Sequence, residues 1–344
     1  DMLGKLIPTT LVGSYPQPNW LVNRDLLLTE APPRVRLRDI WKVAPAELEE
    51  AQNDATLTAI HDQQRAGIDI LSDGEIRRES YFNHFANALE GLDIDNPAFL
   101  PNRRNVAVPV PRVVAEIKRV RPVQVADVSF LRKHTKGPIK VTIPGAFTMA
   151  KLAKDDYYGD FAALVAAYGK AVNGELLDMK AAGADVVQID EPYLQAYPED
   201  ADKYGLAAIN TALAGVPGPT VVHLCFGYAY VVKDKPTGYS FLPQLNASAA
   251  DYVSVEAAQP NLDPAILAEL PAKKFLFGCI DLGSDEVETP HLVAERLRGA
   301  LRYIRPEQLV AAPDCGMKYL SRPVAFAKLQ ALADGAAMVR AEVC

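Results

Sequence analysis

The chain contains few of the residues and patterns that mark specialised protein classes. Its 344 residues include four cysteines, five histidines and two tryptophans. No stretch approaches the roughly 18 consecutive apolar residues of a membrane-spanning helix, and the first residues, DMLGKLIPTT, lack a signal-peptide apolar core. Widely spaced cysteines in so long a chain are not typical of a disulfide framework. We therefore expect a cytoplasmic protein without a membrane partner, whose cysteines serve metal binding, catalysis or packing.

The chain also lacks an excess of positive charge. It has 36 lysines and arginines against 43 aspartates and glutamates, which gives a net charge of -7. This balance argues against nucleic acid as a partner. With 49% hydrophobic and 23% charged residues, the composition is that of a globular protein with a substantial core.

The sequence does contain short apolar runs, most of which are separated by segments with helical periodicity. Eight β-rich runs cover 9–14, 68–75, 139–145, 185–192, 220–225, 251–256, 275–281 and 308–315. Apolar residues at three- and four-residue steps predict helices over 55–67, 161–183, 291–304 and 322–335. Three of these end in Ala-Gly or Asp-Gly, which predicts a helix stop. The alternation predicts an α/β fold, and eight strands favour a TIM (β/α)8 barrel over a doubly wound sheet.

A typical barrel takes about 250 residues, so this chain must carry insertions. We expect one domain over residues 1–344, with insertions near 15–50, 80–137 and 226–250. The second insertion holds two alternating stretches around a basic turn, which predicts a hairpin. We expect the three insertions to form a lid over the C-terminal face.

Polar and metal-binding side chains fall at the C-terminal ends of the predicted strands, where TIM-barrel enzymes carry their active sites. They are Ser14, Asp73, Glu75, Asp190, Glu191, His223, Cys225, Glu256, Asp281, Asp314 and Cys315. The bodies of the strands are Val, Ile, Leu and Ala instead. The sequence therefore predicts a functional site at this end of the barrel.

The most specific candidates are four possible metal ligands. His223 and Cys225 are two residues apart on one predicted strand, so their side chains project from the same face. Glu256 and Cys315, at two other strand ends, would converge with them. One nitrogen, two sulfurs and one oxygen favour zinc over magnesium or calcium. The alternative for each residue taken singly is simple packing in the core.

Six motifs follow one another as TTLVGSYPQP, SDGE, VVQIDEP, HLC, DYVSVE and PDCGMK. In this order the chain resembles, over most of its length, the C-terminal catalytic barrel of cobalamin-independent methionine synthase. The resemblance implies that His223, Cys225, Glu256 and Cys315 hold zinc, which binds homocysteine through its sulfur as a thiolate. That thiolate would attack a methyl group.

The same resemblance places Glu75 and Asp190 at the amino group of homocysteine, and the segment Val12, Gly13 and Ser14 at its carboxylate. Two carboxylates suit an ammonium, and a Gly-Ser turn offers donors to an anion. The alternatives are a salt bridge from Glu75 to Arg77 or Arg78 and a helix-capping role for Asp190.

The chain departs from the family pattern at the positions that would serve the methyl donor. It has room for one barrel only, Gly283 stands where the family has a proton-donating histidine, and Leu152 stands near the position of a tryptophan that stacks on folate. We therefore assign no catalytic acid; His84, Tyr157 and Tyr158 are candidates. The methyl donor is folate or a better leaving group, such as a methyl-corrinoid protein.

Two other functions fit the same pattern. One is a different zinc-dependent thiol alkyltransferase, like the enzyme that opens epoxides with coenzyme M, and the other is a non-catalytic zinc-binding barrel. Asp281 and Asp314 are expected to orient ligands. Cys279 is expected to be packed within the seventh strand, and Cys344 to be exposed.

Overall fold

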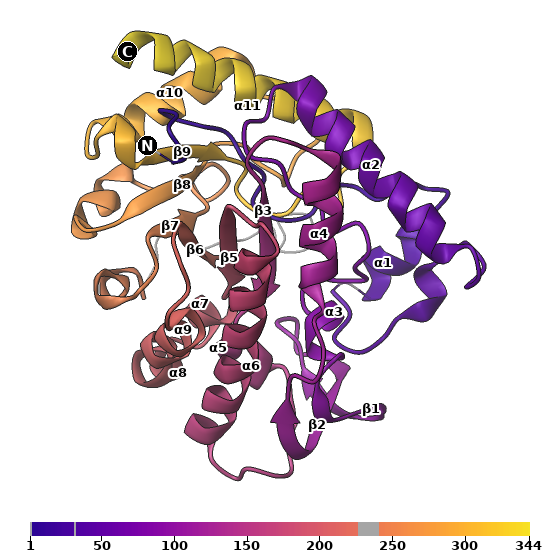
Figure 1. Ribbon diagram of the computed structural model, residues 1–344. Coiled ribbons are helices and arrows are strands. Elements are labelled where there is room, and N and C mark those ends of the chain that lie inside the picture. The colour runs from indigo at the N-terminus through magenta and orange to yellow at the C-terminus, as the bar shows by residue number, and fades with distance from the viewer. Residues whose placement is uncertain (1, 31, 226–240) are drawn as a thin grey trace.

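A parallel six-stranded sheet forms most of the wall of the barrel in the computed structural model, which describes residues 2–30, 32–225 and 241–344 (Figure 1). Its strands follow one another in the order β3-β5-β6-β7-β8-β9, and every neighbouring pair is parallel. They are β3 (Lys140–Pro144), β5 (Val186–Asp190), β6 (Thr220–Leu224), β7 (Tyr252–Val255), β8 (Lys274–Gly278) and β9 (Leu309–Ala312).

The two remaining predicted strands close the ring through short bridges. Parallel bridges join Thr9 to Ala311, Thr10 to Ile70, and Leu71 to Ile139. The Thr10 amide donates to the carbonyl of Ala311 at 3.1 Å, and the Ile70 amide donates to that of Thr9 at 3.0 Å. Both edges of the six-stranded sheet are thereby connected. The TIM barrel is confirmed, and the doubly wound alternative is wrong.

The side chains of the barrel alternate between two cores. The inner core consists of Met2, Val12, Ile70, Val186, Val221, Tyr252, Leu276, Val310 and Ala312. The residues next to them, such as Val187 and Val222, belong to the outer core between strands and helices. Because strand side chains alternate with a period of two, Val221 facing inward places His223 and Cys225 inside as well. The ligand pair therefore projects into the barrel.

Helices surround the barrel, and the four predicted helices are all present (Figure 1). The α-helices are α1 (Arg24–Glu30), α2 (Leu48–Ala66), α3 (Asn83–Ala86), α4 (Gln124–His134), α5 (Ala146–Lys151), α6 (Phe161–Ala181), α7 (Tyr193–Ala196), α8 (Pro198–Asp200), α9 (Leu206–Leu213), α10 (Pro290–Leu301) and α11 (Arg322–Val343). Short 3-10 helices are η1 (Arg38–Ile40), η3 (Leu242–Ala247), η4 (Pro264–Glu269) and η5 (Pro306–Gln308), and η2 (Ala201–Gly205) is a π-helix.

One of the three predicted helix stops is wrong. Helix α2 ends before Gly67, whose φ of 89° is the left-handed conformation of a C-terminal cap. Helix α11, in contrast, continues through Asp334 and Gly335 to Val343. A Cβ at position 335 would lie 2.5 Å from Cγ1 of Val293 on α10. This glycine therefore permits close packing of two helices instead of ending one.

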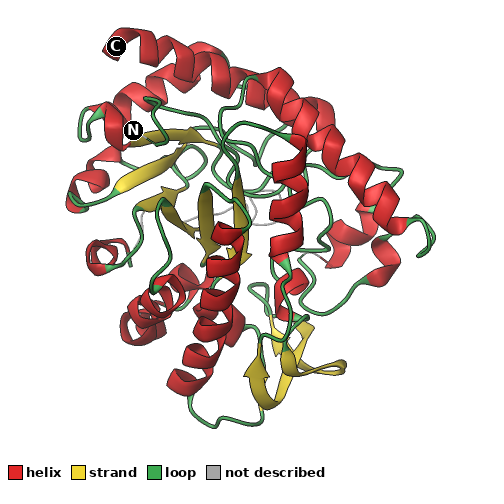
Figure 2. Cartoon of the chain, viewed as in Figure 1, coloured by secondary structure: helices red, strands yellow, loops and turns green. Residues whose placement is uncertain are grey.

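The hairpin predicted within 80–137 is confirmed. Strands β1 (Glu90–Pro101) and β2 (Ala107–Lys118) pair antiparallel, and β4 (Lys154–Asp155) pairs parallel with β2. Figure 2 shows this small sheet apart from the strands of the barrel. Residues 15–50 contain α1 and η1. Of the third expected insertion, 226–240 lies outside the described residues. In the described part of the chain, no helix is long and apolar enough to cross a membrane.

Candidate active site

A cavity of about 620 Å³ opens at the C-terminal end of the barrel. Seven of the nine predicted site residues line its inner end: Val12, Gly13, Glu75, Asp190, His223, Cys225 and Cys315. The outer end is lined by Thr29 and Glu30, by residues from Pro32 to Leu37, and by the tip of the hairpin between Asn102 and Pro109. Strand ends and insertions thus form one cavity; whether the insertions close as a lid stays a prediction.

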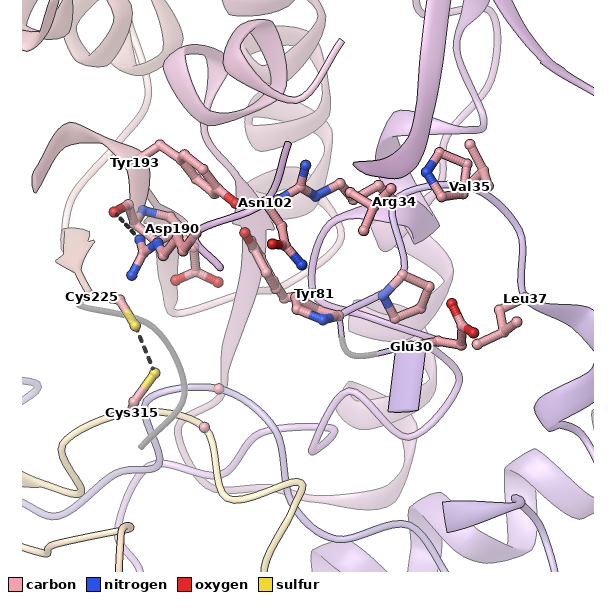
Figure 3. A pocket seen from close by; sticks show the side chains of 18 of the residues that line it. Glu30, Arg34, Val35, Leu37, Tyr81, Asn102, Asp190, Tyr193, Cys225 and Cys315 are labelled. Carbon is pink, nitrogen blue, oxygen red and sulfur yellow. Dashed lines mark hydrogen bonds between the residues drawn. The ribbon is translucent and has the colours of Figure 1, made fainter. Parts of the chain in front are cut away.

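Three of the predicted metal ligands form a tight, buried group. The ligand atoms of His223, Cys225 and Cys315 all lie within 4.8 Å of one another. The two sulfur atoms are 3.1 Å apart (Figure 3). Cys315 follows β9, and the barrel brings it beside Cys225, which directly follows β6 and stands 90 positions earlier in the chain. Packing of single residues does not explain why three metal-binding side chains converge in one cavity.

The orientation of His223 leaves one ring nitrogen available to a metal. Its Nδ1 lies 2.7 Å from the hydroxyl oxygen of Ser254 on β7. Its buried Nε2 has no hydrogen-bond partner among the described residues. A hydrogen bond from Nδ1–H to Ser254 leaves the lone pair on Nε2, and a buried polar atom without a partner points to a ligand.

Glu256 lies at the border of this group. It is fully buried, and its Oε1 is 3.9 Å from the sulfur of Cys225, but it does not belong to the group within 4.8 Å and does not line the cavity. Asp314 accepts hydrogen bonds from the amides of the three residues that follow Glu256, at 2.7 to 3.0 Å. Asp314 therefore holds the turn that carries Glu256.

The four residues fit zinc in the type of their ligand atoms and in the distances between these atoms. Tetrahedral zinc with Zn–S bonds of about 2.3 Å keeps two sulfurs about 3.8 Å apart. The sulfurs of Cys225 and Cys315, at 3.1 Å, need to separate slightly. Oε1 of Glu256 already lies at a distance from Cys225 that suits two ligands of one ion. A set of nitrogen, two sulfurs and oxygen favours zinc over hard cations.

Glu75 lies across the cavity in an unusual conformation. Its φ is 56°, and a Cβ on Gly13 would lie 2.5 Å from its Oε2, so only glycine leaves room for this carboxylate. Burial raises the pKa of Glu75 to about 7. The positive charge of Arg78 lowers this pKa, whereas the negative charges of Asp190 and Asp73 raise it further. The alternative salt bridge is also present, because Arg78 Nη1 lies 3.3 Å from Glu75 Oε1.

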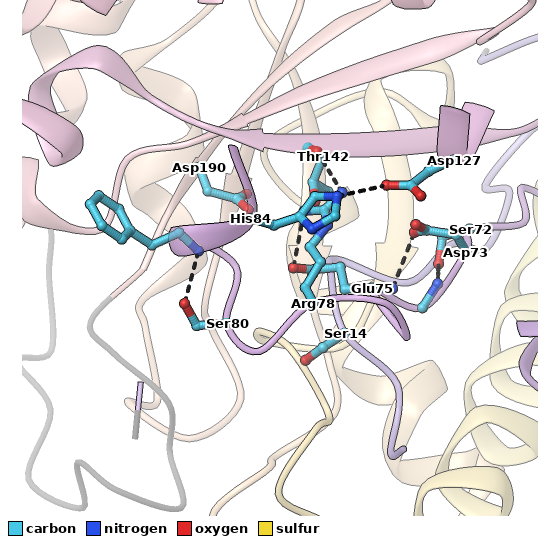
Figure 4. Close-up of polar contacts among 12 residues, drawn as sticks. Ser14, Ser72, Asp73, Glu75, Arg78, Ser80, His84, Asp127, Thr142 and Asp190 are labelled. Atoms are coloured by element: carbon cyan, nitrogen blue, oxygen red, sulfur yellow. Dashed lines mark hydrogen bonds and ion pairs between the residues drawn. The ribbon is translucent and has the colours of Figure 1, made fainter. Parts of the chain in front are cut away.

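Arg78 and Lys318 place positive charge near Glu75. The sequence offered Arg78 only as one of two possible salt-bridge partners, and Lys318, which ends the motif PDCGMK, was missed. Arg78 is fully buried and donates to the hydroxyl and the carbonyl of Thr142 at 3.0 and 2.9 Å (Figure 4). Lys318 donates to the carbonyls of Arg78 and Glu79. Burial lowers the pKa of Lys318 to about 8.

Asp190 ends β5 directly opposite His223 in the strand register. Its Oδ1 accepts a hydrogen bond from Gln188 at 2.8 Å, and burial raises its pKa. The helix-capping alternative is wrong, because α7 begins after Pro192 without any side-chain cap. Beneath it, buried Lys140 donates to the carbonyl of Val12 at 2.9 Å, and burial lowers its pKa to about 7. A lysine within the run IKVTIPG was the overlooked signal.

Ser14 does not face the cavity. It is buried, and its hydroxyl oxygen accepts a hydrogen bond from the amide of Lys318 at 3.2 Å, while its carbonyl accepts one from the amide of Met317 at 2.8 Å. Ser14 thus ties the first strand to the segment after β9. Of the predicted anion-binding segment, Val12 and Gly13 are the residues that border the cavity.

None of the three candidate acids lines the cavity. His84 lies 3.6 Å from Asp127, and burial lowers its pKa to about 3 (Figure 4). The hydroxyl of Tyr158 accepts a hydrogen bond from the amide of Ile117 at 2.9 Å, and Tyr157 beside it is half exposed. The structure therefore places these side chains away from a reacting group.

The two positions that differ from the family pattern are packed. A Cβ at Gly283 would lie 2.9 Å from Nε2 of Gln259 and 3.2 Å from Oδ1 of Asp281, so a histidine there would displace Gln259. Asp281 accepts a hydrogen bond from the amide of Gly283 at 2.7 Å. Leu152 is buried outside the cavity.

The two remaining cysteines lie away from the site. Cys279 is buried just after β8, and its sulfur lies 3.5 Å from the carbonyl oxygen of Ala312. Burial raises the pKa of its thiol. Cys344 is exposed at the end of the chain. Both placements confirm the predictions of a packed and an exposed thiol.

The outer wall of the cavity carries arginines and tyrosines that no sequence motif indicated (Figure 3). Arg34 donates through Nη2 to the hydroxyl of Tyr193 at 2.8 Å. The guanidinium carbons of Arg34 and Arg103 lie 5.9 and 5.2 Å from the centre of the Tyr193 ring. Tyr81 lines the same space.

Fold and site together define a TIM barrel with a candidate thiolate metal site in a cavity at the mouth of the barrel. Residues 7–338 match the family described as cobalamin-independent synthase, catalytic domain. The chain therefore belongs to the family of cobalamin-independent synthase catalytic domains.

Named relatives agree with this family and cover nearly the whole chain. A methionine synthase of Saccharolobus solfataricus is 33% identical over 346 residues, covering 98% of this chain and 96% of the relative. That of Sulfurisphaera tokodaii is 31% identical over 341 residues, covering 98% and 94%. A solved B12-independent methionine synthase from Shewanella sp. W3-18-1, in complex with selenomethionine, is 34% identical with a TM-score of 0.89, covering 98% and 99%.

These comparisons bear on the donor. The family is described as cobalamin-independent and the solved relative as B12-independent. A methyl-corrinoid protein as partner, which the sequence left open, is therefore not supported. The two alternative functions, an epoxide-opening alkyltransferase and a non-catalytic barrel, are not favoured by any of these matches.

Proposed function

We propose that this chain transfers a methyl group to the thiol of homocysteine and forms methionine, with zinc held by His223, Cys225, Glu256 and Cys315. The observation that carries this proposal is that the group of His223, Cys225 and Cys315 shares one cavity with two buried carboxylates. Such a cavity can hold a thiol at one side and an ammonium at the other. The names of the relatives support the same reaction.

The residues of the chain would bind and orient the amino acid. Glu75 and Asp190 would accept hydrogen bonds from its ammonium, whose charge favours the ionised form of Glu75 although burial raises the pKa of this group to about 7. The segment from Val12 to Ser14 would meet its carboxylate through backbone donors. Bound zinc would lower the pKa of the thiol and thereby supply a thiolate at neutral pH.

The geometry also weighs against the alternatives. Coenzyme M carries a sulfonate and no amine, and a sulfonate would be repelled by Glu75 and Asp190. A purely structural zinc site is closed by protein ligands, whereas His223, Cys225 and Cys315 line a cavity that is open to small molecules. Both observations favour a site at which an amino-acid thiol exchanges.

The proposal is tested with zinc-loaded protein, homocysteine and either 5-methyltetrahydrofolate or, in a parallel assay, methylcobalamin. We expect methionine from at least one donor. Cys315→Ser should weaken zinc binding and lower activity by more than the roughly 10- to 100-fold that loss of an outer-sphere partner costs.

Cys344→Ser is the matched control, because Cys344 is exposed at the end of the chain; it should leave both zinc content and activity unchanged. No methionine from either donor would refute the proposed reaction. One equivalent of zinc retained with unchanged affinity in Cys315→Ser would refute the metal site.

A further inference from the structure

Building on the proposed function, we propose that the outer end of the cavity is the subsite of the methyl donor, and that Arg34 together with Tyr193 binds an anionic group of that donor.

The burial and pairing of Arg34 carry this proposal. Its exposed fraction is 7%. Within the described residues, its hydrogen-bond partner is the hydroxyl of Tyr193, and no carboxylate lies within 4.0 Å of its guanidinium. A buried guanidinium without an anionic partner is costly. Because Arg34 also lines the cavity, an anion in the cavity is the partner that would offset this cost.

Arg36, two residues along the chain, shows what a paired arginine in this loop looks like. It makes three hydrogen bonds of 2.8 to 3.2 Å to the carboxylate of Glu79. Arg34 makes no such pair, although it is far more buried. Both arginines line the cavity, and of the two it is Arg34 whose charge is left without a carboxylate partner among the described residues.

A second arginine reinforces the positive charge on this wall. Arg103, at the tip of the hairpin, donates to the carbonyl of Pro192 at 3.0 Å and lies over the same Tyr193 ring. The outer end thus carries Arg34, Arg103 and Arg104 against one carboxylate, Glu30, whereas the inner end carries Glu75 and Asp190. This polarity directs an ammonium inward and an anion outward.

Between the charged groups, the lining is apolar. Pro32, Pro33, Val35, Val106, Val108 and Pro109 all contribute. A volume of about 620 Å³ lies within the range of about 300 to 1,000 Å³ that holds drug-sized ligands, so a second reactant fits beside an amino acid. The donor that suits this subsite has an apolar or aromatic body and carries a carboxylate or a phosphate.

Binding of the donor is measured without homocysteine, so that no reaction takes place. The probes are 5-methyltetrahydrofolate, whose anions are carboxylates, and methylcobalamin, whose anion is a phosphodiester. We expect Arg34→Met to weaken binding of at least one probe by about tenfold or more, which is the loss of one charge-assisted hydrogen bond. Tyr193→Phe should weaken the same probe by a smaller factor, and methionine binding should stay unchanged.

The stability of the variant separates a binding role from a structural one. Replacing a buried, unpaired charge by an apolar side chain of similar length should leave Tm unchanged or raise it. A structural arginine predicts a lower Tm instead. Arg305→Met, at a side chain that is 77% exposed, is the control and should change neither Tm nor probe binding.

Failure of the donor subsite and failure of the proposed reaction give different experimental results. Wild-type protein that binds neither probe, or Arg34→Met that binds both probes like the wild type, would overturn the donor subsite even if methionine is formed. An equal loss of methionine binding in Arg34→Met would overturn it as well, because it indicates damage to the whole cavity. Weaker probe binding in Arg34→Met, in a protein that forms no methionine, would keep the anion site and refute the reaction.

Discussion

At the scale of single residues, Glu75 carries two features that cost folding free energy. Its positive φ of 56° costs on the order of 1–3 kcal/mol for a residue with a side chain. Burial also raises the pKa of its carboxyl group to about 7. Strain and a perturbed pKa at one cavity residue are typical of a binding site. The close approach to Gly13 shows that the neighbouring segment accommodates this carboxylate.

The raised pKa of Glu75 predicts a pH dependence of ligand binding. Protonation below about pH 7 removes the negative charge that holds an ammonium, so the affinity for methionine should fall as pH decreases from 8 to 6. The fall is at most tenfold per pH unit, the limit for loss of one ionised group. Methionine is the ligand to use in calorimetry because it has no thiol proton of its own.

Glu75→Gln should bind methionine more weakly at pH 8 and should lose most of the pH dependence. Glu307→Gln, at an exposed side chain, should bind methionine like the wild type. The same slope in Glu75→Gln and in the wild type would show that another group is responsible.

At the scale of elements, two glycines of the C-terminal helices have opposite roles. Gly335 on α11 faces α10, where an added Cβ would lie 2.5 Å from Val293 Cγ1 and 2.8 Å from the carbonyl of Pro290. Gly299 lies within α10, and the nearest atom to its added Cβ is 3.7 Å away, on Pro264. The first glycine serves packing, and the second only lowers helix propensity.

Gly335→Ala should therefore lower the free energy of unfolding by about 1–3 kcal/mol through overpacking. Gly299→Ala should raise it by about 0.5–1 kcal/mol, because alanine favours the helix and meets ordinary contacts. Urea denaturation of both variants measures the two effects. A neutral Gly335→Ala would mean that α10 and α11 can separate without cost.

At the scale of the whole molecule, the candidate zinc site joins segments that close the barrel. Its residues come from β6, from the turn after β7 and from the segment after β9. An ion that binds the folded protein but not the unfolded chain adds about 2.7 kcal/mol of stability at 100 times its Kd. A metal ion held by these residues would therefore stabilise the whole barrel in addition to its role in the proposed chemistry.

Removal of zinc by a chelator should accordingly lower Tm, and zinc should restore it. Magnesium, a hard cation, should not replace zinc at thiolate ligands. The zinc-dependent increase in Tm should be much smaller in Cys315→Ser. The same increase in this variant would show that the ion binds elsewhere. Thermal denaturation of the wild type and of Cys315→Ser, with and without each metal, measures these changes in Tm.

Much of the barrel and the inner half of the site could be predicted from the sequence. Eight apolar runs, seven of them with a polar or metal-binding residue at the end, predicted the barrel and its functional face. The period of two along β6 predicted that His223 and Cys225 share a face, and their sulfur and nitrogen atoms meet Cys315 in the cavity. These predictions succeeded because strand geometry repeats along the chain and needs no knowledge of distant contacts.

The sequence by itself thus determined the barrel, the strand ends that carry the site and the inward direction of the candidate ligands. Only the tertiary structure decided that Ser14 supports the segment after β9, that Arg78 lies buried beside Glu75, and that Gly335 packs against α10. It also decided that Arg34 meets Tyr193, which is 159 residues away in sequence. The reason is physical: local periodicity sets which way a strand residue points, whereas a contact between two insertions depends on the path of both loops through space, and no local pattern records that path.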